Sequence, residues 1–182
     1  MFIQKYLLLF FGSLMAFAAN SQKVINTSYI NESGEKVLQL EITLPLTTEA
    51  AWKLFTEDEK LQKWIAPLAH IELRSGGYIV TNYDSSKSLS DSSSIRLPIL
   101  SFIENELIIL KVNLNDHFPV SARNTDQNLQ EVIQFKKAGE DHTHIISSMI
   151  GWGKGDDWDK TYLFFEKGNT WTFEELIKYV KQ

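Results

Sequence analysis

Two closely spaced histidines are the residues of this chain that most resemble part of a metal site. His142 and His144 are two positions apart, so a strand would place both imidazoles on one face. A zinc or other transition-metal site needs at least one further protein ligand. The remaining histidines, His70 and His117, are distant in the sequence. We therefore interpret the histidine pair as part of an exposed strand beside a turn and predict no metal site.

Nucleophilic catalysis and nucleotide binding have little support in the sequence. Seven of the 16 serines lie in residues 85–94, which lack hydrophobic periodicity and predict an exposed loop, and no G-x-S-x-G motif is present. The glycines of residues 151–155 do not have dinucleotide-binding spacing, and Asp156 and Asp157 would repel a phosphate. The chain has no cysteine, which excludes thiol catalysis. We predict no catalytic residue and no cofactor, and interpret residues 151–155 as a flexible turn.

Four ionisable residues of predicted strands keep an enzymatic alternative open. Glu41, Arg96, Glu131 and His144 would each face inward after a register change of one residue. An enzyme that used an interior cavity for cyclisation or hydrolysis would need such a buried group with a shifted pKa. A cavity lined by no ionisable side chain would contradict this alternative.

Aromatic residues provide the strongest functional signal. The chain has 5 Trp, 6 Tyr and 11 Phe, more than a small core requires. Small-molecule pockets are typically lined by apolar and aromatic groups with a few polar ones. Asn169 shares a predicted helix face with aromatic residues, and a buried amide there needs a partner. The predicted ligand-binding residues are Trp64, Tyr78, Phe102, Trp158, Tyr162, Phe165 and Asn169.

Hydrophobic periodicity predicts the elements that would position these residues. Two short helices are predicted between Thr47 and Pro67, and a long helix starts near Asp156 or Asp157. Residues 115–128 are polar and predict a long loop. The order of elements predicts one α+β domain, residues 22–182, with about six to seven antiparallel strands. The segments predicted as strands are residues 24–29, 36–44, 71–74, 78–83, 95–103, 107–114, 129–136 and 143–150.

The N-terminus and the overall charge indicate a compartment and exclude some partners. Lys5, an apolar run over residues 6–19 and small residues near its end predict a signal peptide at residues 1–21. We therefore expect an exported protein, periplasmic or extracellular, with no membrane span after signal removal. A net charge of −5 with only three arginines excludes a nucleic-acid partner that is bound through a basic face.

Several short motifs resemble the START-like (SRPBCC) superfamily. Leu-Pro-Leu-Thr-Thr-Glu-Ala-Ala-Trp at residues 44–52 resembles its entry from a strand into a helix. Trp-Ile-Ala-Pro at residues 64–67 and Leu-Arg-Ser-Gly-Gly-Tyr at residues 73–78 are similar to two further motifs, and residues 165–176 are similar to its closing helix. The resemblance covers residues 36–182 and is strongest to the branch named for the activator of heat-shock-protein-90 ATPase.

The resemblance implies a helix-grip fold, in which a curved antiparallel sheet wraps around a long C-terminal helix and two short helices seal one end. Members bind lipids, sterols or polyketides, act as cyclases or hydrolases, or assist a chaperone. Our leading hypothesis is an exported binder of a small hydrophobic molecule, held between the sheet and the C-terminal helix. The alternatives are a cyclase- or hydrolase-like enzyme that uses the same cavity, and a protein-interaction or chaperone-assisting module with a filled interior and an unknown partner.

Overall fold

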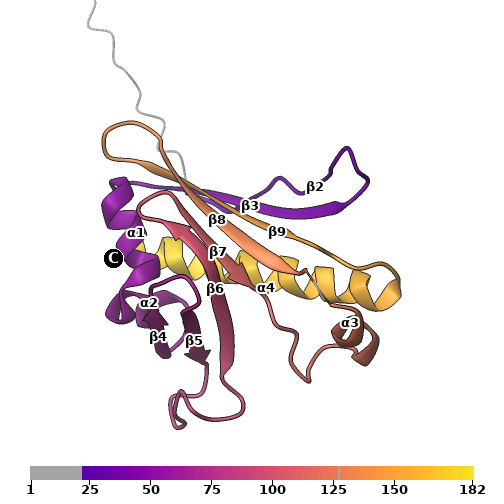
Figure 1. Ribbon diagram of the computed structural model, residues 1–182. Helices are drawn as coiled ribbons and strands as arrows, with labels where there is room; N and C mark the ends of the chain where they lie inside the picture. Colours follow the sequence, from indigo (N-terminus) through magenta and orange to yellow (C-terminus); the bar gives the residue numbers. More distant parts are fainter. Residues whose placement is uncertain (1–21, 127) are drawn as a thin grey trace, which may run out of the picture.

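A computed structural model describes residues 22–126 and 128–182, so the predicted signal peptide lies outside the described residues. A curved antiparallel sheet wraps around one long helix, as Figure 1 shows, which confirms the predicted helix-grip α+β fold. Among the described residues, no helix is both long and apolar enough to cross a lipid bilayer. In chain order the elements are β1 (Ile25–Asn26), β2 (Tyr29–Ile30), β3 (Lys36–Leu44), α1 (Thr48–Thr56), α2 (Asp58–Trp64), β4 (Leu68–Glu72), β5 (Tyr78–Asn82), β6 (Ile95–Ile103), β7 (Leu107–Lys111), α3 (Val120–Thr125), β8 (Gln130–Lys137), β9 (Thr143–Ile150) and α4 (Asp156–Val180).

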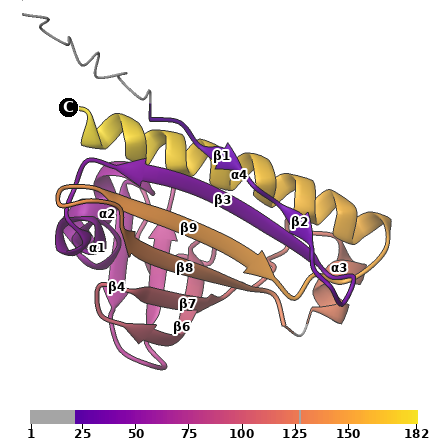
Figure 2. The same cartoon turned by 90° about the horizontal axis from the view of Figure 1, so that it is seen from above.

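The sheet has nine strands, compared with eight segments predicted as strands and the six to seven strands expected for the sheet. Its order is β1-β3-β9-β8-β7-β6-β5-β4, and β2 also pairs with β3. The excess arises partly because the segment predicted as one strand, residues 24–29, forms two strands of two residues each. Between them Ser28 Oγ accepts the backbone N–H of Gln39 at 3.0 Å, which replaces a backbone partner in the ladder. Figure 2 shows this N-terminal segment between the edge of β3 and α4.

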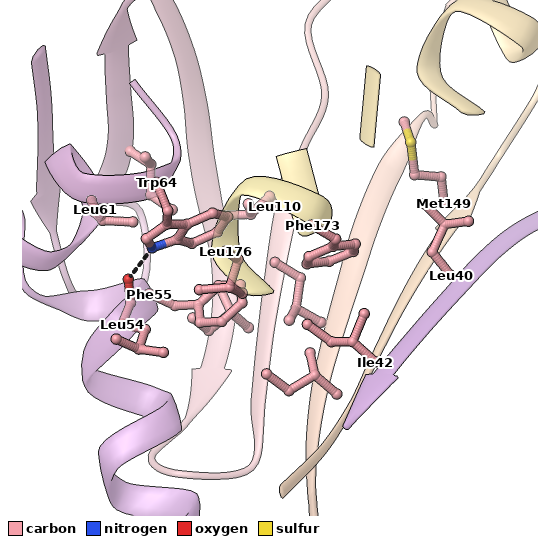
Figure 3. Packing of buried hydrophobic residues seen from close by; sticks show 14 of the residues in the cluster. Leu40, Ile42, Leu54, Phe55, Leu61, Trp64, Leu110, Met149, Phe173 and Leu176 are labelled. Carbon is pink, nitrogen blue, oxygen red and sulfur yellow. Dashed lines mark hydrogen bonds between the residues drawn. The ribbon is translucent and has the colours of Figure 1, made fainter. Parts of the chain in front are cut away.

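Helices α1 and α2 close one end of the sheet. Thr47 caps α1 by accepting the backbone N–H of Ala50 at 3.3 Å. The indole Nε1 of Trp64 donates to the carbonyl of Leu54 at 2.9 Å, which fixes α2 on α1. Figure 3 shows Trp64, Leu110, Phe173 and Leu176 in one apolar cluster, in which the two short helices, the sheet and α4 meet.

Helix α4 is anchored at both ends but less closely in the middle. Trp158 and Thr161 are buried near its start, and Phe173, Leu176 and Ile177 are buried near its end. No residue in positions 162–172, all of which the structure describes, is buried. Acidic residues in the first turn suit the positive end of the helix dipole. The middle of α4 is therefore the part that leaves room between the helix and the sheet.

Two segments that were predicted as loops have defined local structure. The predicted loop at residues 115–128 contains α3, because a helix of six residues is too short to show periodicity in the sequence. Thr125 of α3 accepts the Trp158 indole N–H at 2.9 Å, which attaches α3 to α4. In residues 84–94, Ser93 donates two hydrogen bonds to Asp91 Oδ1, which hold the pKa of Asp91 down at about 2.

Candidate functional site

A cavity of about 830 Å³ lies between the sheet and the middle of α4. The sheet side of its wall includes Ile79, Leu97, Leu110 and Ile133, and the closed end includes Phe55, Leu61 and Trp64. The α4 side includes Phe164, Phe165, Asn169, Thr172 and Phe173. These positions follow from the fold, since β5 and β8 alternate their side chains between the two faces of the sheet. The cavity therefore occupies the place where α4 has no buried residue.

Three of the seven predicted ligand-binding residues line this cavity, namely Trp64, Phe165 and Asn169. Trp64 contributes to the closed end, and the other two lie on the middle of α4. Ligand binding by these three residues stays a prediction.

The structure places the other four residues outside the cavity wall. Tyr78 lies on the opposite face of β5 from Ile79, and the Arg96 guanidinium lies 3.5 Å from the centre of its ring. Phe102 packs on Trp52 with ring centres 6.4 Å apart, and Trp158 is buried where α4 begins. Tyr162 packs on Trp152 at 4.9 Å. Strand alternation and close aromatic packing explain why these four residues lie outside the cavity wall. A count of aromatic residues reveals neither feature.

Further aromatic side chains, outside the seven predicted ligand-binding residues, also line the cavity. Phe118 stacks on Phe165 with ring centres 5.2 Å apart and planes 6° apart, and meets Phe164 edge to face at 5.0 Å. Tyr83, Phe164 and Trp171 line the cavity although they are 53%, 59% and 50% exposed, so they lie where it opens to solvent. Their aromatic character was the only sequence signal that could have placed them at the site. Phe118 was hardest to find, because it falls in a segment predicted as a loop.

Glu131 is the one of the four ionisable strand candidates that lines the cavity. It lies on the same face of β8 as the buried residues Ile133 and Phe135. Ser147, its neighbour on β9, donates to Glu131 Oε1 at 2.6 Å. Burial raises the pKa of Glu131 and the serine hydrogen bond partly opposes that rise. Glu131 is thus the kind of group that the enzymatic alternative requires, an ionisable side chain in the cavity with a shifted pKa.

The other three ionisable candidates lie away from the cavity. His144 Nε2 is 3.0 Å from Glu41 Oε2, and its Nδ1 is 3.2 Å from Thr43 Oγ1, on the outer face of the sheet. A hydrogen bond from Thr27 lowers the pKa of Glu41, with a smaller contribution from His144. Within residues 22–126 and 128–182 there is no cluster of three or more His, Asp or Glu side chains that could hold a metal ion.

The sequence profile described as "Activator of Hsp90 ATPase homolog 1-like protein" matches residues 45–181. The chain belongs to this family. The match covers the short helices, most of the sheet and α4, and confirms the resemblance to the START-like superfamily. A search of curated proteins finds no significant match.

Solved structures share the fold of this family member at low sequence identity. A conserved protein of unknown function from Enterococcus faecalis aligns with a TM-score of 0.62 and 13% identity, covering 85% of this chain and 76% of that one. CalU16 from Micromonospora echinospora aligns with a TM-score of 0.61 and 10% identity, covering 88% and 86%. A protein from Nitrosomonas europaea aligns with a TM-score of 0.57 and 19% identity, covering 80% and 94%. At these identities the likeness concerns the fold alone.

The raised pKa of Glu131 predicts a pH-dependent stability difference in this family member. The folded protein holds the Glu131 proton more tightly than the unfolded chain, so this contribution to stability is present below the usual glutamate pKa and is lost as the pH rises through the raised pKa. Glu131→Gln cannot ionise. Relative to the parent, the variant is expected to gain unfolding free energy as the pH rises from mildly acidic to mildly alkaline.

Urea denaturation of both proteins across that pH range measures this gain. The lowered pKa of Glu41 affects both proteins equally and cancels in the difference. A stability difference that stays constant with pH would show that Glu131 titrates normally.

Proposed function

We propose that this chain is an exported binding protein for a small, largely apolar molecule, which is held between the sheet and the middle of α4. The observation that carries the proposal is the cavity of about 830 Å³ with its aromatic wall. Sites for small molecules usually measure about 300–1,000 Å³ and have mainly apolar linings. Export is supported by the signal-peptide pattern of residues 1–21.

Apolar burial would supply most of the binding free energy. Removing apolar surface from water contributes about 25 cal/mol per Å², from which the costs of ordering and association are subtracted. The START-like superfamily that the chain resembles includes binders of lipids, sterols and polyketides. A protein-interaction module with a filled interior, our third hypothesis, fits a cavity of this size less well.

Native mass spectrometry of the protein exported from a bacterial host tests this function. We expect a reproducible small adduct that is lost on solvent extraction, and a polypeptide mass that shows cleavage after residue 18 or 21. A polypeptide that remains bare under gentle conditions and also binds no apolar dye would contradict the binding proposal. A polypeptide that retains its first residues after secretion would contradict the predicted signal peptide.

A second candidate function, catalysis on the bound molecule, is favoured specifically by Glu131. A carboxyl group with a raised pKa inside a cavity is suited to act as a general acid. In that case the protein converts the extracted molecule to a product, and Glu131→Gln loses the conversion but still binds. Recovery of the molecule unchanged after long incubation with excess protein would exclude this candidate.

A further inference from the structure

Glu131 lines the cavity on its sheet side and is hydrogen-bonded there to the buried Ser147. Glu131 on β8 and Ser147 on β9 point to the same side of the sheet as Ile133 and Ile145. Ser147 is 2% exposed, and its hydroxyl donates to Glu131 Oε1 at 2.6 Å. Placing a carboxyl group among apolar side chains costs free energy unless its hydrogen-bonding capacity is used.

The second oxygen of this carboxyl is available to a ligand. Among the described residues, none donates a hydrogen bond to Glu131 Oε2, and this oxygen is not fully enclosed by protein. Glu131 keeps part of its surface accessible, and that surface belongs to the cavity wall. Burial raises the pKa of Glu131, so this carboxyl holds its proton to higher pH than an exposed glutamate does. With Ser147 donating to Oε1, the acid proton is best placed on Oε2 as a donor toward the cavity.

Asn169 brings a second polar group to the same region from the helix side. Its Nδ2 lies 3.3 Å from the sulfur of Met149, which is the strand partner of Glu131. A thioether is a weak acceptor, so the amide of Asn169 retains hydrogen-bonding capacity. Asn169 lines the cavity, as Glu131 does. The sheet and the helix therefore each contribute one hydrogen-bonding side chain to this part of the cavity.

We propose that Glu131 and Asn169 together bind a polar group of the ligand, so that the ligand is a mostly apolar molecule with a neutral hydrogen-bond acceptor such as a ketone, ester or amide carbonyl. This inference rests on the proposed function and names the chemical class of its ligand. The carboxyl O–H and the amide N–H are both donors, and a carbonyl oxygen accepts two hydrogen bonds. A purely apolar ligand would leave both side chains without that partner.

The groups that surround Glu131 carry no charge. Leu110 of β7 and Met149 of β9 are its strand partners, Ser147 is its hydrogen-bond donor, and Asn169 approaches from α4. The other charged or titratable side chains that border the same cavity are exposed, namely Tyr83, Asp84, Lys87 and His117. Ionisation of Glu131 would therefore place an uncompensated negative charge beside a carbonyl oxygen.

Two matched dyes test the proposal. One is the naphthalene dye prodan, whose propionyl carbonyl shifts the emission to longer wavelength when it accepts a hydrogen bond, and the other is its propyl analogue without the oxygen. We expect the parent protein to prefer prodan by about tenfold in Kd, which corresponds to one hydrogen bond of about 1.4 kcal/mol. Glu131→Leu should lose this preference and shift the emission to shorter wavelength, whereas Glu131→Gln, which keeps an N–H donor, should retain most of it.

A titration of the parent protein provides a measurement that does not depend on how the variants fold. As the pH rises and Glu131 ionises, the preference for prodan should fall while the affinity for the propyl analogue changes less. Equal affinities for the two dyes at all pH values, with no effect of Glu131→Leu, would overturn the inference and leave the proposed function intact. If the parent binds neither dye, the proposed function fails and the inference fails with it.

Discussion

Replacing Gly153 with alanine is expected to destabilise the protein by about 3 kcal/mol, because the new methyl group has no space. A Cβ at this position would lie 2.1 Å from Nε1 and 2.2 Å from Cε2 of Trp158. The Trp158 side chain is 4% exposed and its Nε1 donates to Thr125 Oγ1 at 2.9 Å. The indole therefore cannot move without losing that hydrogen bond and disturbing the contact between α3 and α4.

Gly168 provides the matched control for this prediction. It lies within α4, and apart from its neighbours and the backbone of its own helix no described atom lies within 4 Å of the Cβ that alanine would add. Gly168→Ala should stabilise the protein by about 0.5–1 kcal/mol, since alanine favours a helix over glycine. Thermal and urea denaturation of both variants measures the difference. Equal effects of the two substitutions would show that Trp158 does not pack on Gly153 as described.

Replacing Phe165 with aspartate is expected to weaken the binding of an apolar dye by about a hundredfold or more, or roughly 2.7 kcal/mol. The substitution removes a ring that lines the cavity and is stacked on Phe118 at 5.2 Å. It also introduces a carboxylate into a largely apolar wall, where an unpaired charge is costly. Fluorescence titration with prodan gives the Kd, and near-ultraviolet circular dichroism establishes that the variant is folded.

Leu163→Asp serves as the control for Phe165→Asp. Leu163 lies on the same helix, is 51% exposed and does not line the cavity. The same added charge should therefore change the Kd by less than about twofold, in keeping with a solvated surface position. A folded Phe165→Asp variant that binds the dye as tightly as the parent would show that the ligand binds elsewhere.

The glycine-rich segment shows how far local sequence reasoning reaches. Its position between a strand and a helix predicted a flexible turn, and the positive φ of Gly155, 101°, is a conformation that glycine adopts readily. Gly151 and Gly153 have an additional role, because a Cβ at Gly151 would lie 2.1 Å from the carbonyl oxygen of Asn128. The close approach at Gly151 involves Asn128, which is distant in the sequence, so no local pattern predicts it.

The alternation of side chains explains why only part of the candidate site was predictable. Trp64, Phe165 and Asn169 were chosen from helical patterns, and all three line the cavity. Tyr78 was chosen as an aromatic residue of a strand, but Ile79 is the residue of β5 that faces the cavity. Glu131 could be named only as one of four candidates, because a shift of one residue reverses the face of a whole strand.

The sequence by itself determined the family, the order of the elements, the two short helices and the long C-terminal helix. These features follow from local periodicity and from short motifs, which depend on neighbouring residues alone. Only the tertiary structure decided which side chains surround the cavity. Glu131 and Asn169 both line it, whereas Trp158 and Tyr162 do not. These outcomes depend on the curvature of the sheet and on where α4 is anchored to it, since both bring together residues that are far apart in the chain.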